Sequence, residues 1–197
     1  MKFKRAVVAL IVLICFCITL FAAFKAGMKY CINKRLNQDR ECYIGSFYSE
    51  LCLTIELLSS VEDWELSIQS TTIRKNPFRQ LLTKLNSMKK LNEYAYWNMR
   101  NDKNAYVFTD LKESFGLIQT TIGDGWTCDD FLKDGVLSQN EIRFLISLKQ
   151  DLERIKNSLY NEETGQANSN ITMEELRDIV KPFTDKYDRG FILIQNN

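Results

Sequence analysis

The chain contains no histidine, and this absence removes several kinds of catalytic and metal site at once. Without an imidazole there is no Ser-His-Asp or Cys-His nucleophile pair, no mixed Cys/His zinc site and no histidine proton shuttle. Proline and glycine are scarce, with 2 and 8 residues among 197, which favours long helices over a turn-rich β fold. Lysine and arginine (26) nearly balance aspartate and glutamate (25), so net charge gives no reason to expect a nucleic-acid partner.

The cysteines are irregularly spaced and include no CxxC pair, so they predict no metal site. They are Cys15, Cys17, Cys31, Cys42, Cys52 and Cys128. The first two fall within an apolar run, where we expect them to face lipid or another helix. For the other four we expect buried, reduced thiols. Their even number leaves disulfides open as an alternative.

One long hydrophobic run dominates the sequence. Residues 6–24 read AVVALIVLICFCITLFAAF and contain no charge. At about 1.5 Å per helical residue, such a run nearly matches a hydrocarbon layer of about 30 Å. We therefore predict a transmembrane helix at residues 6–26. The predicted membrane-anchor residues are Ala6, Leu10, Ile14, Leu20 and Phe24.

A secretory signal peptide is the alternative to a retained anchor. Signal peptides have an apolar region of about 7–15 residues followed by a small-x-small cleavage site. This run is longer, and phenylalanine falls where a small residue is needed near Ala22 and Ala23, so retention is favoured. The chain begins with a basic tail at residues 1–5, but more basic residues follow the span than precede it. The positive-inside rule then favours a cytoplasmic domain, with the extracytoplasmic orientation left open.

The rest of the chain predicts an all-α fold, in which the transmembrane helix is followed by an antiparallel bundle of about five helices. A basic juxtamembrane linker is expected at 27–42, a bundle domain at 43–190 and a C-terminal tail at 191–197. The main helices are expected at 43–61, 77–100, 105–122, 138–160 and 173–187, because apolar residues recur there at intervals of three and four. A short helix is expected to begin at Thr127.

Helix-start signals support these boundaries. Asn76 followed by Pro77 is typical of an N-cap and a first helical position. Ser138 with Glu141, and Thr172 with Glu175, have the spacing of capping boxes. Residues 161–170 are expected to form a polar loop.

Two segments resemble the calcium-binding loop of an EF-hand. In residues 130–141 the candidate metal ligands are Asp130, Asp134 and Glu141, but Leu132 stands where an oxygen ligand is needed. Residues 164–175 give a weaker match, with neutral side chains at Thr164, Gln166 and Asn168. Because both matches depend on a Ser/Thr-x-x-Glu helix cap, we predict no bound metal and no cofactor.

Other candidate sites each have a simpler structural interpretation. Cys128 has acidic neighbours, which oppose thiolate formation. The carboxylate pairs at 162–163 and 174–175 fall in a loop and a first helical turn, where acids are common anyway. Aromatic residues near two basic residues could form a nucleic-acid or partner surface, although packing on the bundle is the commoner arrangement. These residues are Tyr94, Tyr96, Trp97 and Tyr106, close to Arg100 and Lys103.

Three motifs in order along the chain resemble a known family. They are NPFRQLL at 76–82, GWTCDD at 125–130 and LSQNEIRFLISLKQDL at 137–152. Together with the N-terminal span, they resemble the stage III sporulation protein AB family of spore-forming bacteria. The resemblance implies a helical bundle akin to the F-type platform proteins of type II secretion, and it implies no catalytic residues.

The sequence therefore predicts a non-enzymatic, single-pass, membrane-anchored helical subunit that acts in assembly. The resemblance implies that the assembly is a sporulation or secretion-like membrane complex. The expected partners are the lipid bilayer and other membrane-complex subunits or further copies of the chain, with no nucleic acid and no identified small-molecule substrate. The alternative is an extracytoplasmic sensor or ligand-binding bundle. An enzyme would need a site made without histidine, for example at Cys128 or Glu141.

Overall fold

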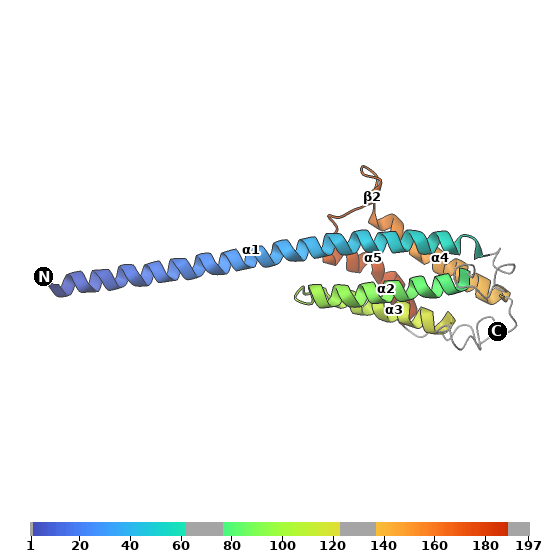
Figure 1. Cartoon of the computed structure of the whole chain (residues 1–197), viewed down its shortest axis with the longest axis horizontal. Helices are drawn as coiled ribbons and strands as arrows, with labels where there is room; N and C mark the ends of the chain where they lie inside the picture. The colour runs from blue at the N-terminus through green and yellow to red at the C-terminus, as the bar shows by residue number, and fades with distance from the viewer. Residues whose placement is uncertain (1, 62–76, 123–136, 189–197) are drawn as a thin grey trace. The chain divides into compact units, whose positions relative to one another are not determined.

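The computed structural model describes residues 2–61, 77–122 and 137–188. Within these ranges the protein is all-α, as predicted, with five helices and one pair of two-residue strands. The elements, in chain order, are α1 (Lys2–Leu58), α2 (Pro77–Met99), α3 (Tyr106–Ile122), α4 (Gln139–Leu159), β1 (Tyr160–Asn161), β2 (Gln166–Ala167) and α5 (Met173–Asp188). Figure 1 labels the helices and β2 along the chain.

Helix α1 is a single helix that runs without a break from Lys2 to Leu58. The helix predicted at 43–61 is therefore not a separate element but the C-terminal part of α1. The chain divides into two compact units, Met1–Gln38 and Asp39–Asn197. The first unit consists of the N-terminal part of α1, and the second contains the remaining helices.

In the second unit, α2 packs against α3, α3 against α5, and α4 against α5. The α2–α3 connection is a tight turn in which the Asp102 amide donates to the Met99 carbonyl at 2.8 Å. The Asp102 carboxylate then accepts from the Asn104 amide at 2.8 Å, so the turn closes without an unpaired amide at that position. This short connection makes α2 and α3 antiparallel neighbours (Figure 1).

Aromatic side chains connect the helices through the core. Tyr43 and Phe47 of α1 contact Phe108 and Phe115 of α3, with ring centroids 4.7 Å and 6.2 Å apart. Phe115 also lies 5.2 Å from Phe183 of α5. Such tilted and edge-on arrangements suit the quadrupoles of the rings. These contacts explain why the C-terminal part of α1 belongs to the bundle although it continues the apolar N-terminal helix.

Two buried tyrosines, Tyr43 and Tyr187, carry hydroxyl groups whose acceptors are also buried. The Tyr43 hydroxyl donates to Asn92 Oδ1 of α2 at 2.8 Å, and the Asn92 amide donates to the Met88 carbonyl at 2.8 Å. The Tyr187 hydroxyl of α5 donates to Asp151 Oδ2 of α4 at 2.9 Å. Burying a polar group is tolerable only when it is paired, so each tyrosine fixes the side chain opposite it.

Most apolar residues that recur at intervals of three and four are buried, but some are not. Leu91 of α2 is half-buried, and the polar Asn92 beside it is fully buried. Leu53 of α1 is 44% exposed. Ile142 and Ile179 are half-buried, whereas Phe144 is buried. The intervals between apolar residues locate the apolar face of a helix. The packing of the neighbouring helices then determines which residues at the edge of that face are buried.

Both predicted capping boxes are present. At α4 the Ser138 side chain accepts from the Glu141 amide, and the Glu141 carboxylate accepts from the Ser138 amide. At α5 the Thr172 amide and hydroxyl donate to Glu175 Oε2 at 2.7 Å and 2.8 Å. These bonds satisfy amides that have no partner within the helix, and they fix where α4 and α5 begin.

The segment predicted as a polar loop contains a small β-hairpin, which the sequence analysis missed. Tyr160 pairs with Ala167 and Asn161 with Gln166 in antiparallel register. Gly165 has φ 68°, a conformation that favours glycine, and its amide donates to the Asn161 carbonyl at 2.9 Å. Several predictions fall outside the described residues: the Asn76 N-cap, the short helix from Thr127, and the tail at 191–197.

Candidate functional site

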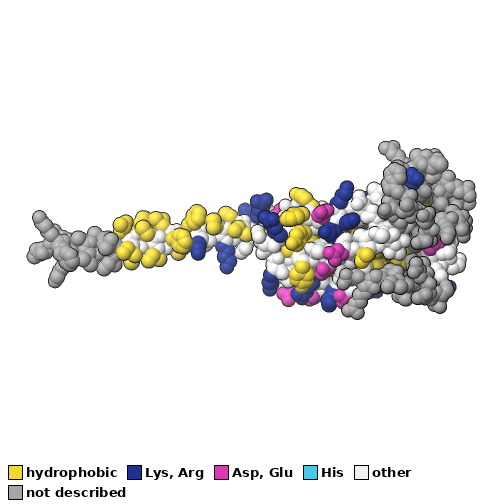
Figure 2. Space-filling view, turned by 90° about the horizontal axis from the view of Figure 1, so that it is seen from below, with side chains coloured by type: hydrophobic (Ala, Val, Ile, Leu, Met, Phe, Trp, Pro, Cys, Tyr) yellow, Lys and Arg dark blue, Asp and Glu magenta, His cyan; other side chains and the backbone are white. Residues whose placement is uncertain are grey.

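The N-terminal part of α1 is apolar and exposed. Of the predicted anchor residues, Ile14, Leu20 and Phe24 are exposed side chains on α1, and Ala6 and Leu10 lie in the same helix. Figure 2 shows the hydrophobic side chains (yellow) covering the described start of this segment. Among the residues that the structure describes, α1 is the one helix long and apolar enough to cross a membrane. A membrane span and a signal sequence share these features.

Of the three predicted metal ligands, Glu141 alone lies in the described part of the chain. Glu141 caps α4 and is buried, while Asp130 and Asp134 lie outside the described residues. In the second candidate loop, Gln166 pairs in the hairpin, and the Thr164 hydroxyl accepts from the Gln166 amide at 3.4 Å. No group of three or more Cys, Asp or Glu side chains in the described ranges is placed to hold a metal ion.

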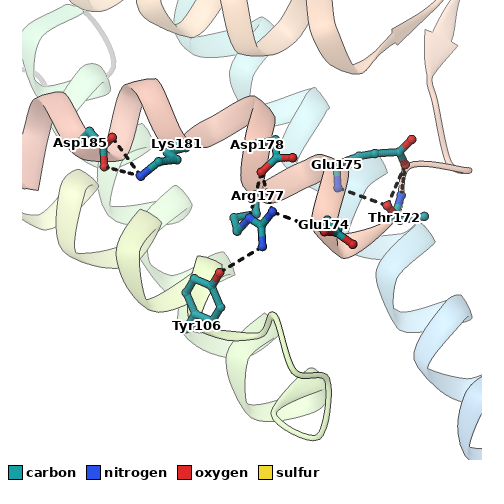
Figure 3. Close-up of polar contacts among 8 residues, drawn as sticks. All are labelled: Tyr106, Thr172, Glu174, Glu175, Arg177, Asp178, Lys181 and Asp185. Carbon is teal, nitrogen blue, oxygen red and sulfur yellow. Dashed lines mark hydrogen bonds and ion pairs between the residues drawn. The ribbon is translucent and has the colours of Figure 1, made fainter.

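A polar groove of about 340 Å³ lies between α3 and α5. Arg177, Tyr106 and Asp178 line the groove, and Figure 3 shows Arg177 between the other two. The guanidinium donates to the Tyr106 hydroxyl at 3.5 Å and to Asp178 Oδ1 at 2.8 and 2.9 Å. These hydrogen bonds raise the pKa of Arg177, and the bond to Tyr106 has the largest effect. Because the cation already contacts a carboxylate, an anionic ligand would have to compete with Asp178.

Other charges along this groove are paired in the same way. Lys181 Nζ lies 3.1 Å from Asp185 Oδ2, one helical turn away (Figure 3). Glu174 lies 3.7 Å from Arg177, and Glu175 belongs to the helix cap. The predicted carboxylate pair at 174–175 is thus divided between two structural roles. The hydrogen bond from the Thr172 amide is the main reason that the pKa of Glu175 is lowered.

A buried carboxylate joins α4 to α5. Asp151 accepts from Tyr187 and from Lys186, and its other oxygen lies 3.4 Å from Arg154. Lys186 also donates to the Ser147 hydroxyl at 2.9 Å. Burial, followed by the charge of Asp151, raises the pKa of Tyr187. Every group in this cluster has a partner, and the cluster holds α4 and α5 together.

The aromatic residues near the C-terminal end of α2 do not pack on the bundle, and the expectation that they would was wrong. Tyr94 is 69% exposed and Trp97 is 59% exposed, and Tyr96 and Tyr106 are also exposed. The Arg100 guanidinium lies 5.8 Å from the Trp97 ring, on the same side of the helix. We call Tyr94, Tyr96, Trp97 and Arg100 the aromatic surface. Clustered exposed aromatics of this kind are typical of interaction surfaces.

An apolar groove lies beside this surface, between α1 and α2. Its volume is about 250 Å³, and its lining includes Cys42 and Ser46 of α1 and Leu91, Tyr94 and Asn98 of α2. The sequence did not indicate this groove, because its two walls come from helices far apart in the chain. It gives the aromatic surface a concave neighbour, which the side chain of a partner could occupy.

The expectation of buried thiols was wrong for Cys31 and Cys42, which are exposed on α1, while Cys52 is half-buried and Cys128 lies outside the described residues. Cys15 and Cys17, which we expected to face lipid or another helix, are also exposed on α1, and all five described cysteines are free thiols. For Cys31, the reason is that the first unit of the chain contains no second element that could cover it. The spacing of residues along one helix cannot reveal whether another element packs against it.

The resemblance to the stage III sporulation protein AB family rests on three short motifs. The first and third fall largely on α2 and α4, where most of their apolar residues are buried and Ser138 caps α4. The second, at 125–130, lies outside the described residues. Helix starts and apolar intervals occur in many unrelated bundles, so the resemblance stays a prediction. Comparisons with family models, curated proteins and solved structures found nothing that matches this chain.

Proposed function

We propose that this protein is a non-enzymatic, single-pass, membrane-anchored helical subunit that serves in the assembly of a larger membrane complex. One observation carries the proposal: α1 is a single helix whose N-terminal part exposes apolar side chains and whose C-terminal part supplies core residues. Ile44, Phe47 and Leu51 are fully buried, whereas Leu20 and Phe24 are more than half exposed. A helix with these two parts suits a lipid anchor joined directly to a folded domain.

The assembly part of the proposal rests on the aromatic surface. Tyrosine, tryptophan and arginine are enriched where proteins bind one another, and tryptophan most often carries the binding energy. The polar groups described above are engaged in caps, ion pairs and helix contacts, which suits a structural role. A sporulation or secretion-like complex is the setting that the sequence resemblance implies, and we keep it as part of the proposal.

The anchor is tested by deleting residues 2–24 from the full chain. We expect the full chain to stay with membranes after alkaline carbonate washing and the deleted chain to become extractable. A reporter fused after Asn197 then gives the side of the membrane on which the bundle lies. Recovery of a mature chain trimmed near Ala23 from the culture medium would show a cleaved signal sequence and overturn the proposal.

The assembly role is tested by Tyr94→Ser with Trp97→Ser, compared with Tyr160→Ser on the hairpin as an exposed control. We expect the full chain, gently solubilised from membranes, to migrate in a complex larger than the chain itself on a native gel. The double variant should lose most of this complex, while the control keeps it. A complex unchanged by the double variant would remove the aromatic surface from the proposal.

A further inference from the structure

Charge is divided unevenly between the two compact units of the chain. The first unit, Met1–Gln38, carries seven lysines and arginines and no aspartate or glutamate. Residues 39–197 carry the remaining 19 of the 26 basic residues and all 25 acidic residues. A chain that is almost neutral as a whole thus joins a basic helical segment to an acidic bundle. Such asymmetry indicates that the basic segment meets an anionic partner of its own.

Four of these cations follow the apolar span of α1. We call them the basic collar: Lys25, Lys29, Lys34 and Arg35. All four side chains are exposed, and no acidic residue precedes Asp39. Lys25 Nζ lies 5.1 Å from the centroid of the Phe21 ring, so the collar begins directly at the end of the apolar run. Figure 2 shows dark blue side chains appearing along α1 beyond the first yellow ones.

The collar surrounds α1 rather than marking one side of it. With 3.6 residues per turn, each residue advances about 100° around a helix. Measured from Lys25, Lys29 lies about 40° around the axis, Lys34 about 180° and Arg35 about 280°. A folded protein partner would meet one side of the helix, whereas a membrane surface meets every side at the same depth. The distribution therefore favours a membrane surface as the anionic partner.

The length of the collar also suits a headgroup layer. The polar layer on each side of a bilayer is about 5–8 Å thick. In a helix perpendicular to the membrane, Lys29 lies about 6 Å beyond Lys25 along the axis, within that layer. Arg35 lies about 15 Å beyond Lys25, and therefore no more than about 10 Å outside the layer. That distance is about one Debye length at 0.1 M salt, so the whole collar senses the headgroup charge.

Large apolar side chains lie among the cations. Tyr30 is 68% exposed, Met28 48% and Ile32 50%. Tyrosine is enriched where headgroups meet acyl chains, because its ring is apolar and its hydroxyl is polar. A nucleic-acid backbone would pair with the cations but would leave Met28 and Ile32 in water. Lipid accounts for both kinds of side chain, so it is the partner that fits this segment.

We propose that the basic collar binds anionic phospholipid headgroups and gathers these lipids around α1 where it leaves the membrane. The inference rests on the proposed function, because headgroups reach the collar only if residues 6–24 span the bilayer. Each lysine or arginine near an anionic surface favours binding by about fivefold. The acidic bundle would be repelled by the same headgroups, so the attraction comes from the collar.

The test measures which lipids lie next to α1 in the full chain reconstituted in bilayers. The six cysteines are replaced by serine or alanine, and Leu20→Cys carries a bimane fluorophore within the apolar span. The bilayers are phosphatidylcholine with a fixed fraction of acyl-brominated lipid, which is either phosphatidylglycerol or phosphatidylcholine. Bromine quenches the fluorophore on contact, so the ratio of the two quenching efficiencies gives the preference for the anionic lipid.

We expect phosphatidylglycerol to quench several-fold more effectively than phosphatidylcholine at low salt. Lys29→Gln, Lys34→Gln and Arg35→Gln together should lower this ratio several-fold, while Lys25 is kept so that the end of the span is unchanged. About 1 M salt should have a similar effect, because it shortens the Debye length to about 3 Å. Lys29→Arg with Lys34→Arg should keep the ratio, since the charge is unchanged.

The matched control removes three exposed cations from the bundle, with Lys90→Gln, Lys103→Gln and Arg143→Gln, and should keep the preference. An equal loss from this control would overturn the inference, because overall charge would then set the ratio. A ratio near one in the unmodified collar would also overturn it, while quenching by both lipids would leave the anchor standing. A fluorophore that neither lipid quenches would instead overturn the proposed function, so the two failures are distinguishable.

Discussion

The two parts of α1 contain similar residues in opposite surroundings. In residues 13–32 the large apolar side chains are exposed, with Phe16 at 59% and Phe24 at 64%. In the C-terminal part of α1, Ile44, Phe47 and Leu51 are completely buried. The comparison shows that apolar content alone does not place a residue in a core. A continuous apolar run has no polar side to turn toward water, whereas a stripe at intervals of three and four has one.

The two regions also treat polar groups differently. In the N-terminal part of α1, Thr19 donates to the Phe16 carbonyl of its own helix at 2.8 Å, so its hydroxyl is paired without a second element. In the bundle, Tyr43 and Asp151 bond to side chains of other helices. Pairing between helices specifies which helices meet, whereas pairing within a helix leaves its sides available to lipid. The predictions below test this contrast.

The largest expected difference comes from matched phenylalanine truncations. Phe115→Ala removes a ring that contacts Phe47 and Phe183, and we expect a loss of about 3–5 kcal/mol in the free energy of unfolding. Phe16→Ala, on the exposed part of α1, should leave that free energy within about 0.5 kcal/mol. The measurement is urea unfolding of the full chain in detergent, followed by near-ultraviolet circular dichroism. Similar losses of stability from both variants would contradict the proposed difference between the buried and the exposed phenylalanine.

The next largest effect concerns the buried carboxylate. Asp151→Asn removes the charge that Lys186 and Tyr187 contact, and we expect a loss of about 2–3 kcal/mol, because Lys186 then lacks its anionic partner. Asp185→Asn, which breaks the exposed ion pair with Lys181, should cost at most about 0.5 kcal/mol. The same unfolding assay compares them. Equal losses of stability from Asp151→Asn and Asp185→Asn would mean that burial does not strengthen the contacts of Asp151.

Much of the fold was predictable because it follows from local rules. The capping pairs Ser138–Glu141 and Thr172–Glu175 lie three residues apart, so the sequence alone located the starts of α4 and α5. The helix class and most core positions followed from the intervals between apolar residues. The hairpin at Tyr160 was missed because two-residue strands leave no alternating pattern.

The candidate surfaces were less predictable because they depend on neighbours distant in the chain. Tyr94 and Trp97 are close together in the sequence, but the sequence does not show that both side chains are exposed. Nothing in the sequence around Asn92 indicates that this residue is buried. Its side chain accepts a hydrogen bond from the Tyr43 hydroxyl, which lies 49 positions away in the chain. Cys31 was expected to be buried because free cysteines commonly are, yet it lies where α1 has no neighbouring element.

Alkaline pH should also separate the two regions. Burial raises the pKa of both Tyr43 and Tyr187, so the folded state keeps these phenols protonated more firmly than the unfolded state does. Their contribution is therefore complete below about pH 10 and is lost as the pH rises above it, by about 1.4 kcal/mol per pH unit for each tyrosine. We expect bundle stability to fall over this range while the helicity of an isolated peptide of residues 2–38 in micelles stays constant. Tyr43→Phe should make the fall shallower, and an unchanged slope would contradict the assignment.

The smallest expected effect is at the cap of α5. The hydrogen bond from the Thr172 amide lowers the pKa of Glu175, so its contribution is present above the unfolded pKa and is lost as the pH falls through the folded one. Glu175→Gln keeps the shape but removes the charge, and the variant should show a weaker decline in stability under acid than the unmodified chain. Because Glu175 is exposed, solvent screens its charge. We therefore expect this difference in stability to be no larger than the loss caused by Asp185→Asn. Glu163→Gln on the hairpin, whose carboxylate has no helix cap to support, serves as the control, and unfolding in acid compares the slopes. A control that matched Glu175→Gln would show that acid acts on overall charge rather than on this cap.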